Sequence, residues 1–293
     1  MPPYELWRTL RVKKHEDGKS LLTLLCTRFP FIQETVWKQR IESGWLQRNG
    51  QPLSTKIALH KGDEIRHYSP RVVEPSVPDS LTVLEETSDW LFIYKPAPMP
   101  MHAGGRYVKN TALHVLYEMG YRDVRTVHRL DAVTSGLVLL ARSKEIAAQL
   151  RTEFDAGRVT KIYRAVVSGC VRESVTVSLP IRRKQGFVFE CGDALAGAKE
   201  AATIIRPVRY LSEENATLVE CEPLTGRTHQ LRLHLEACGH PIVDDPIYGP
   251  HGDKSGKRIQ NSAISLQSSG LEIKEMGIRK FLKAYPKYYH HYW

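Results

Sequence analysis

The sequence contains no run of the roughly 20 apolar residues that a membrane-spanning helix requires. Its start, Met-Pro-Pro-Tyr-Glu-Leu-Trp, lacks the basic and then apolar layout of a secretory signal. The five cysteines are an odd, scattered set and form no Cys-x-x-Cys pair. These absences argue against a membrane partner and indicate reduced thiols, so we expect a cytoplasmic protein.

What the chain has in excess is positive charge. Its 42 Lys and Arg against 32 Asp and Glu give a net charge of +10, which favours a polyanionic partner. Residues 1–70 alone carry 12 Lys and Arg against 7 Asp and Glu. The 42% apolar content is that of a globular protein, and 293 residues suffice for one large and one small domain.

The first 70 residues read as a small α+β unit. Ser20 is placed to cap an apolar helix that begins at Leu21, and a second helical pattern runs through Trp37 and Ile41. Asn49-Gly50 then predicts a tight hairpin. Three prolines in the stretch that follows indicate an extended linker.

In the remaining chain, strands outnumber helices and many strands are neighbours in the sequence. We therefore predict an α+β fold with a large mixed, mostly antiparallel sheet. Helical spacing predicts helices over residues 110–119 and 144–154. Strands are predicted at residues 81–86, 90–96, 137–141, 161–169, 174–179, 187–190, 201–207 and 216–222.

Two segments carry the chemistry. His-Arg-Leu-Asp-Ala-Val-Thr-Ser-Gly, residues 128–136, places Asp131 at the mouth of a buried strand, where a carboxylate is costly unless it is paired or used. An Asp that caps a turn is the structural alternative. In Gly-Arg-Thr-His-Gln-Leu-Arg-Leu-His-Leu, residues 226–235, Thr228 is placed to cap a helix that contains Leu231 and ends before Gly239.

The sequence resembles the RluA-type pseudouridine synthases, because both segments match that family's signature at every fixed position. The resemblance implies that Asp131 is catalytic, that Tyr163 stacks on the base, and that Arg227 forms an ion pair with Asp131. It also implies that His128, Arg129 and Leu231 bind the substrate. The resemblance further implies a pseudouridine synthase fold with a central cleft, and no cofactor. No metal is expected, since His229 and His234 are five residues apart and not at the i, i+4 spacing of helical ligands.

The reaction that the resemblance implies needs few groups. Uracil leaves ribose as a delocalised anion, so one carboxylate can suffice where a glycosidase uses two. Attack on C1′, attack on C6, and proton abstraction at C2′ all remain open. Two rival functions also remain: an RNA-binding assembly factor without catalysis, and a hydrolase that uses His128, Asp131 and Ser135 but lacks a nucleophile elbow.

The resemblance also sets the expected organisation of the chain. Residues 15–70 resemble an S4 RNA-binding domain between an N-terminal arm, residues 1–14, and a linker, residues 71–80. The synthase domain is expected over residues 81–275 and a basic, aromatic tail over residues 276–293, more often a packed helix than an RNA contact. We expect a monomer that acts on RNA, with ribosomal RNA preferred over tRNA.

Overall fold

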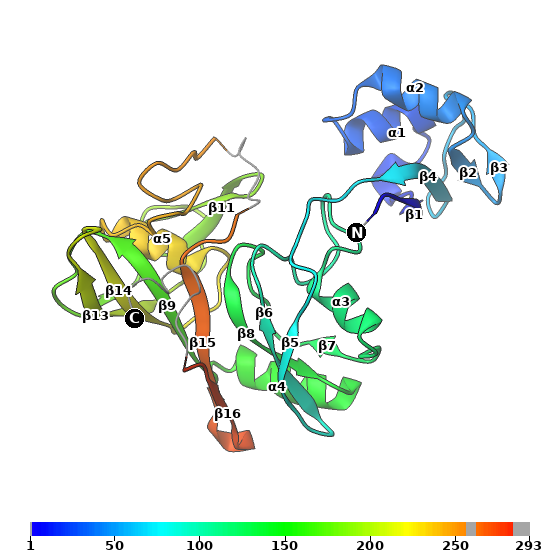
Figure 1. Ribbon diagram of the computed structural model, residues 1–293. Coiled ribbons are helices and arrows are strands. Elements are labelled where there is room, and N and C mark those ends of the chain that lie inside the picture. The colour runs from blue at the N-terminus through cyan, green and yellow to red at the C-terminus, as the bar shows by residue number, and fades with distance from the viewer. Residues whose placement is uncertain (1, 256–261, 284–293) are drawn as a thin grey trace. The chain divides into compact units, whose positions relative to one another are not determined.

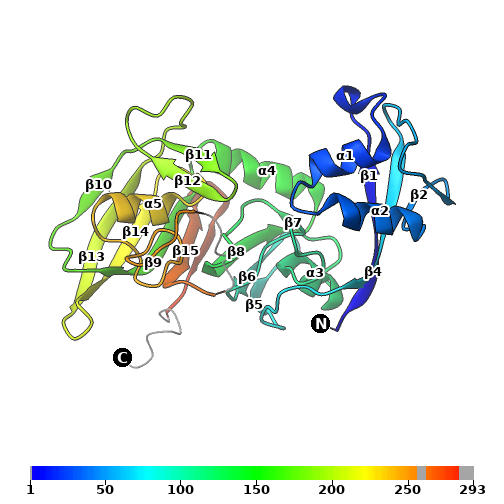
Figure 2. The same ribbon diagram turned by 90° about the horizontal axis from the view of Figure 1, so that it is seen from above.

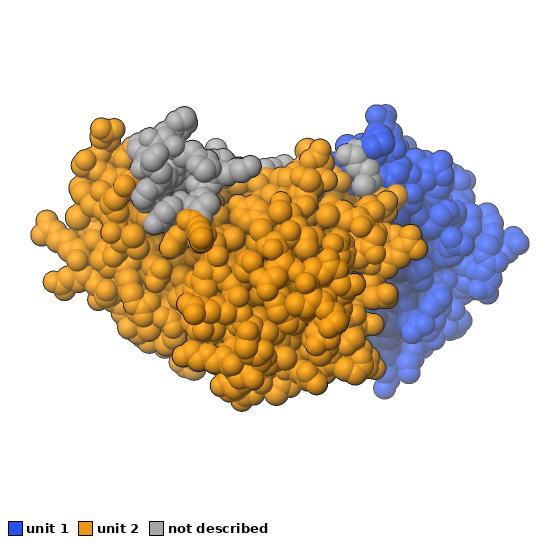
Figure 3. Space-filling view, turned by 60° about the horizontal axis from the view of Figure 1, so that its bottom comes forward, with its two compact units in different colours: residues 1–74 blue, residues 75–293 orange. Residues whose placement is uncertain are grey.

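The computed structural model describes residues 2–255 and 262–283. The chain divides into two compact units, Met1–Glu74 and Pro75–Trp293 (Figure 3). The boundary falls inside the segment expected as a linker. Each unit has a hydrophobic core of its own.

Unit 1 is a four-stranded sheet with two helices (Figure 1). Its elements are β1 (Tyr4–Arg11), the 3₁₀ turn η1 (Lys14–Glu16), α1 (Leu21–Arg28), α2 (Glu34–Glu42), β2 (Leu46–Arg48), β3 (Gln51–Pro52) and β4 (Glu64–Val72). The strand order is β1-β4-β2-β3. Residues 1–14, expected as an arm or a short strand outside the domain, include strand β1, which pairs along β4 and belongs to the sheet.

Local sequence signals explain how unit 1 folds. The Ser20 hydroxyl accepts a hydrogen bond from the Thr23 N–H and caps α1, as predicted. Asn49 and Gly50 both have positive φ, the backbone that a two-residue hairpin turn of this type requires. Apolar side chains of both helices and three strands then form one core, among them Leu21, Leu25, Trp37, Ile41, Leu46 and Ile65.

Unit 2 is built on a ten-stranded sheet, which confirms the predicted fold class. Its helices are α3 (Ala112–Glu118), α4 (Lys144–Asp155) and α5 (Gln230–Ala237), with the 3₁₀ turn η2 (Lys274–Met276). Its strands are β5 (Thr82–Glu86), β6 (Trp90–Lys95), β7 (Arg125–Thr126), β8 (Ser135–Ala141), β9 (Thr160–Ser168), β10 (Val175–Val177), β11 (Ile181–Gln185), β12 (Val188–Cys191), β13 (Thr203–Leu211), β14 (Ala216–Pro223), β15 (Leu266–Ile273) and β16 (Ile278–Phe281). The main path is β10-β13-β14-β9-β15-β8-β6-β5, while β11 and β12 form a separate hairpin.

The strand that carries the first signature is covered on both faces. Val138 and Leu140 of β8 pack in one cluster with α3, and Leu137 and Leu139 pack in another with α4. Figure 2 shows α3 and α4 on opposite sides of this part of the sheet. Burial on both faces explains why the strand is a continuous apolar run and not an alternating one.

Strand β15 joins the two halves of the sheet, between β8 and β9. It runs parallel to β8, where Gln267 pairs with Ser135 and Ser268 with Gly136. Gly136 has φ +116, and a Cβ atom there would lie 2.2 Å from the Ser268 carbonyl oxygen. Only glycine permits this approach, which accounts for the glycine of the Thr-Ser-Gly segment.

The end of the described chain differs from the expected tail. Residues 278–281 form β16, which pairs antiparallel with β15, so they extend the sheet and do not form a helix. The aromatic residues from Tyr285 onward lie outside the described residues. All five cysteines are free thiols, as expected. In the described parts of the chain, no helix is both long and apolar enough to cross a membrane.

Candidate active site

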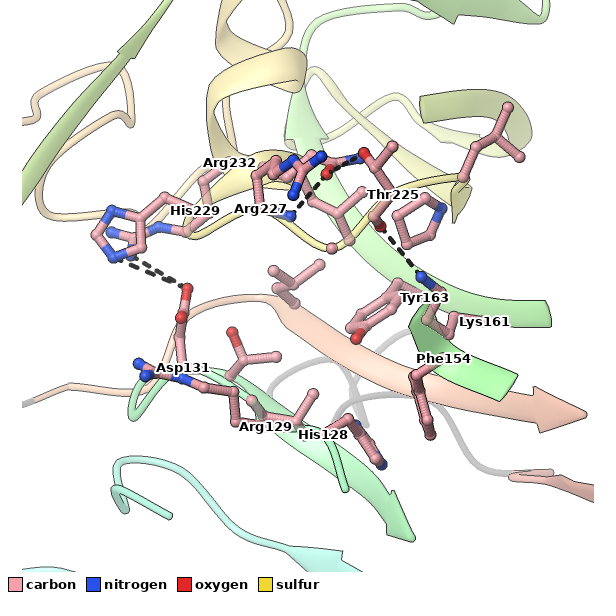
Figure 4. Close-up of a pocket in the computed structure, with 18 of the residues that line it drawn as sticks. His128, Arg129, Asp131, Phe154, Lys161, Tyr163, Thr225, Arg227, His229 and Arg232 are labelled. Carbon is pink, nitrogen blue, oxygen red and sulfur yellow. Dashed lines mark hydrogen bonds and ion pairs between the residues drawn. The ribbon is translucent and has the colours of Figure 1, made fainter. Parts of the chain in front are cut away.

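One cleft of about 450 Å³ in unit 2 gathers both signature segments. It is lined by the loop before β8, by β9, and by the segment that leads into α5. Figure 4 shows side chains from these elements facing one another across it. All six residues singled out from the sequence line this cleft: His128, Arg129, Asp131, Tyr163, Arg227 and Leu231.

Asp131 is held in a short, hydrogen-bonded turn. The Thr134 N–H donates to the Asp131 carbonyl oxygen at 3.1 Å, and the Met99 N–H donates to the next carbonyl, of Ala132, at 2.8 Å. The Asp131 side chain is 21% exposed, so it is neither buried nor free in solvent. Its carboxylate therefore points into the cleft from a turn that the neighbouring backbone fixes.

The arginine that faces Asp131 is Arg232, not Arg227. The Arg232 Nη1 lies 3.8 Å from Asp131 Oδ2, an ion-pair distance (Figure 4). Arg227 is exposed and its Nε donates to the Glu200 carbonyl oxygen at 2.9 Å. Within residues 2–255 and 262–283, no ion pair joins Arg227 to Asp131, so the predicted pairing is wrong.

Arg232 is itself fixed by Asp245 in a buried, two-pronged contact. Its Nε and Nη2 donate to the two Asp245 oxygens at 2.5 and 2.8 Å. Burial alone would raise the pKa of Asp245, but the hydrogen bonds and charge of Arg232 outweigh it and lower that pKa. The remaining Nη1 is buried and has no hydrogen-bond partner among the described residues. The guanidinium is therefore held rigidly with one nitrogen, Nη1, left without a hydrogen bond to a described residue, and that nitrogen faces Asp131.

Tyr163 projects from β9 into the same cleft (Figure 4). Burial, and then the negative charge of Asp131, raises the pKa of Tyr163 to about 12. The phenol therefore keeps its proton at neutral pH. A ring in this place offers an apolar face beside a carboxylate, which suits a planar base.

The cleft also carries positive charge near Asp131, one of the two aspartates that line it. The Lys161 Nζ donates to the Thr225 carbonyl oxygen at 3.1 Å, and burial lowers the pKa of this lysine. Arg129 is exposed at the margin of the cleft. Such an arrangement favours an anionic ligand with a planar group.

Comparison with known proteins places this geometry in a family. Residues 89–237 match the RNA pseudouridylate synthase family. The chain belongs to this family. The match contains Asp131, Tyr163, Arg227 and Arg232, and of the residues that line the cleft only Leu266 lies outside it.

Named relatives agree with this assignment. The chain is 33% identical to the mitochondrial tRNA pseudouridine(32) synthase of Saccharomyces cerevisiae, over 97% of this chain and 62% of that protein. It is 29% identical to the tRNA pseudouridine(31) synthase of the same yeast, over 88% of this chain and 74% of that one. The solved structure of human RNA pseudouridylate synthase domain containing 1 superposes with a TM-score of 0.60 at 26% identity, covering 72% of this chain and 86% of the human one. The chain spans less than two thirds of the first yeast protein.

His128 has a structural place in this pseudouridylate synthase fold. Its Nε2 accepts a hydrogen bond from the Leu139 N–H at 2.9 Å, and its ring stacks on Phe154 at 4.9 Å. Burial lowers the pKa of His128 to about 3. The nitrogen that could serve as a base is therefore already occupied by the backbone, which removes the support for a hydrolase built on His128, Asp131 and Ser135.

Sequence reasoning missed several groups beside Asp131. Lys95 is fully buried, and its Nζ donates to the Met99 and Ala132 carbonyl oxygens at 2.8 and 3.4 Å. Burial lowers the pKa of Lys95 to about 7. A lysine in an apolar strand that ends in Lys-Pro was a usable signal, because a buried ammonium needs acceptors. Arg232, Asp245, His229 and Tyr248 were also missed.

Proposed function

We propose that this chain is an RNA pseudouridine synthase in which Asp131 reacts with the target nucleoside. The carrying observation is that Asp131, Arg232 and Tyr163 converge in one cleft although they come from separate parts of the sequence. In the reaction the N1–C1′ bond breaks and a C5–C1′ bond forms. The C5 proton leaves and N1 gains one, so no other reactant is needed.

Each group has a role that its surroundings support. The Asp131 carboxylate acts as the nucleophile or base, and Arg232 opposes it with a positive charge. Tyr163 offers a face on which uracil can stack as it turns. Arg129 and Lys161 oppose the phosphates of the strand that carries the extruded nucleotide.

We propose tRNA as the substrate. The names of two yeast relatives specify tRNA, at positions 31 and 32, which are adjacent nucleotides. The relatives compared offer no support for the ribosomal RNA that was preferred from the sequence. The cytoplasmic location and the monomeric state stay predictions.

The test uses tRNA transcripts that carry tritium at C5 of uridine, since isomerisation releases that hydrogen to water. We expect release in proportion to pseudouridine mapped by sequencing, and loss of more than about 1,000-fold in Asp131→Asn. Equal release by Asp131→Asn would overturn the catalytic assignment. Tight binding of tRNA and ribosomal RNA with no pseudouridine in either would favour the assembly-factor alternative.

We also propose that unit 1 contacts RNA, in keeping with its expected S4-like character, which itself stays a prediction. On the sheet of unit 1, Trp7 is 38% exposed and lies 4.9 Å from Tyr68, ring centre to ring centre. The Arg66 guanidinium lies 4.5 Å from the Trp7 ring centre. Aromatic rings beside a guanidinium form a stacking surface for unpaired bases.

Trp7→Ala in the full chain tests this surface. We expect a weaker Kd for tRNA by about 10-fold, because stacking on one ring contributes in that range. Phe31→Ala is the control, because Phe31 is another exposed aromatic residue of unit 1. Equal effects of the two substitutions would contradict a stacking role for Trp7.

A further inference from the structure

His229 occupies an unusual position at the start of α5. It is the N-cap residue and has φ +58, a left-handed backbone that few non-glycine residues adopt. Its side chain is 9% exposed, and its two ring nitrogens face different groups. Nδ1 lies 2.9 Å from the Tyr248 hydroxyl, and Nε2 lies 3.9 Å from Asp131 Oδ2. A strained backbone thus holds a buried imidazole between a phenol and the candidate catalytic carboxylate.

Hydrogen-bond direction determines which ring nitrogen carries the proton. The Phe189 N–H, which can only donate, lies 2.9 Å from the Tyr248 oxygen. The Tyr248 oxygen is therefore an acceptor in that bond. Among the described residues, Nδ1 of His229 is the acceptor within reach of the Tyr248 proton. Nδ1 then accepts, and the proton of the neutral ring is on Nε2.

The protonation states of both rings agree with this direction. Burial lowers the pKa of His229 to about 4, although the charge of Asp131 acts in the opposite sense. Burial raises the pKa of Tyr248 to about 12. At neutral pH the imidazole is therefore uncharged and the phenol keeps its proton, as the chain of donors requires.

We propose that His229 is a positioning residue for the reaction and that its Nε2–H is directed at Oδ2 of Asp131. The Arg232 Nη1 faces the same oxygen. With two donors directed at Oδ2, the carboxylate is fixed in rotation and Oδ1 is the oxygen that reacts. The Tyr248 hydroxyl determines the tautomer of His229 by donating to Nδ1. The Phe189 N–H of β12 in turn fixes the direction in which that hydroxyl donates. This assignment rests on the proposed synthase function.

Kinetics of substituted full-length protein test the role. His229→Asn suits the left-handed backbone but is too short to present a donor at the Nε2 position, whereas His229→Gln can present its amide there. We expect His229→Asn to lower kcat about 30-fold with KM within about two-fold, and His229→Gln to recover most of that loss. Equal kcat for the two variants, or an effect on KM alone, would overturn the role.

Ring ¹⁵N NMR of the histidine-labelled protein gives a readout that needs no RNA, with the His229 signal assigned by its loss in His229→Gln. We expect the Nε2–H form in the wild type and a mixture of forms in Tyr248→Phe. Tyr210→Phe is the matched control, because Tyr210 is exposed near the end of β13 and its hydroxyl donates to Asn215 in the turn that follows. An Nδ1–H signal in the wild type, or no change in Tyr248→Phe, would contradict the inference. Absence of tritium release by the wild type would instead count against the proposed function.

Discussion

Each unit contains a buried carboxylate that accepts hydrogen bonds from two nitrogens of one arginine. The two pairs differ in what the rest of the guanidinium contacts. In unit 1, Arg28 donates through Nε and Nη2 to Glu16, and Nη2 also donates to the Arg11 carbonyl oxygen. In unit 2, Arg232 grips Asp245 in the same way. Its Nη1 is buried without a hydrogen bond to any described residue and faces Asp131.

The comparison separates a structural pair from a functional one. The Nε and Nη2 atoms of Arg28 link η1, α1 and β1, so these two nitrogens hold the unit together. Arg232 is equally fixed, but its Nη1 makes no hydrogen bond to a described residue and lies in the cleft, where it faces Asp131. A buried unsatisfied donor costs free energy, and such groups persist where they are used. In a buried ion pair, an arginine nitrogen that makes no hydrogen bond therefore indicates where a functional contact can form.

The largest expected effect is that of Arg232→Lys. Lysine keeps the charge but cannot reach Asp245 and Asp131 together, so we expect kcat to fall by at least about 100-fold. Tritium release from tRNA measures the loss, and circular dichroism checks that the variant is folded. Arg227→Lys is the matched change at the arginine that faces Glu200, and we expect less than about five-fold from it. A larger loss in Arg227→Lys would restore the pairing expected from the sequence.

Glu16→Gln should break the corresponding pair in unit 1 without impairing catalysis. We expect a loss of about 3 kcal/mol in the free energy of unfolding, because an arginine is left without its partner. Urea unfolding followed by tryptophan fluorescence measures the loss, and kcat at saturating tRNA should be unchanged. A kcat that fell in parallel with stability would erase the contrast between the two pairs.

The pH dependence of the same pair has a definite sign. The hydrogen bond and charge of Arg28 lower the pKa of Glu16 from 4.5 to about 2. The folded state therefore gains stability that is complete above pH 4.5 and is lost as pH falls toward 2. In Glu16→Gln this part of the acid dependence should disappear, so the unfolding curves of the two proteins should converge at low pH.

The smallest effect concerns one histidine from each unit, the buried His67 and the half-buried His128. His67 packs against Trp37 and its Nε2 has no hydrogen-bond partner among the described residues, whereas His128 accepts from the Leu139 N–H. Phenylalanine at position 128 leaves that N–H unpaired, so we expect His128→Phe to lose about 2 kcal/mol. His67→Phe should change stability by less than about 1 kcal/mol, because no partner is lost. Thermal unfolding at pH 8 compares them, and equal losses would contradict the assignment.

Both histidines also predict the direction of acid sensitivity. Burial lowers the pKa of His67 to about 4 and of His128 to about 3, below the ordinary value of 6.5. Between pH 6.5 and these lowered pKa values, the unfolded chain binds more protons than the folded one. The free energy of unfolding therefore falls as the pH drops below 6.5. Each Phe variant should show a shallower fall than the wild type.

The sequence allowed much of the fold to be predicted because local signals and burial agree. Ser20 caps α1, the run in β8 is buried on both faces, and the spacing in residues 144–154 gives α4. The hairpin strand β11 was missed because Arg182, Arg183 and Lys184 hide its pattern. Strand β16 was missed because it forms by pairing with β15, and the sequence alone does not show which strand is its partner.

The two arginines differ in their place relative to α5. Thr228 was expected to cap the helix, and the resemblance assigned the ion pair to Arg227 just before it. In the structure His229 takes the left-handed N-cap and Gln230 is the first helical residue. Arg232 is therefore in the first turn and buried, while Arg227 precedes the helix and is exposed. A helix whose residues from Gln230 to Leu235 are all buried implies that its arginine has a partner. Naming that partner required the distance to Asp245 and Asp131.

Strand β15 has a consequence for the order in which the molecule can be completed. The backbone at Ser268 fits against Gly136, and Leu266 lines the cleft, yet both follow the Asp131 turn by more than 130 positions. A nascent chain leaving the ribosome therefore contains Asp131 long before it contains β15, which lines the same cleft. The cleft is complete only after β15 has paired between β8 and β9.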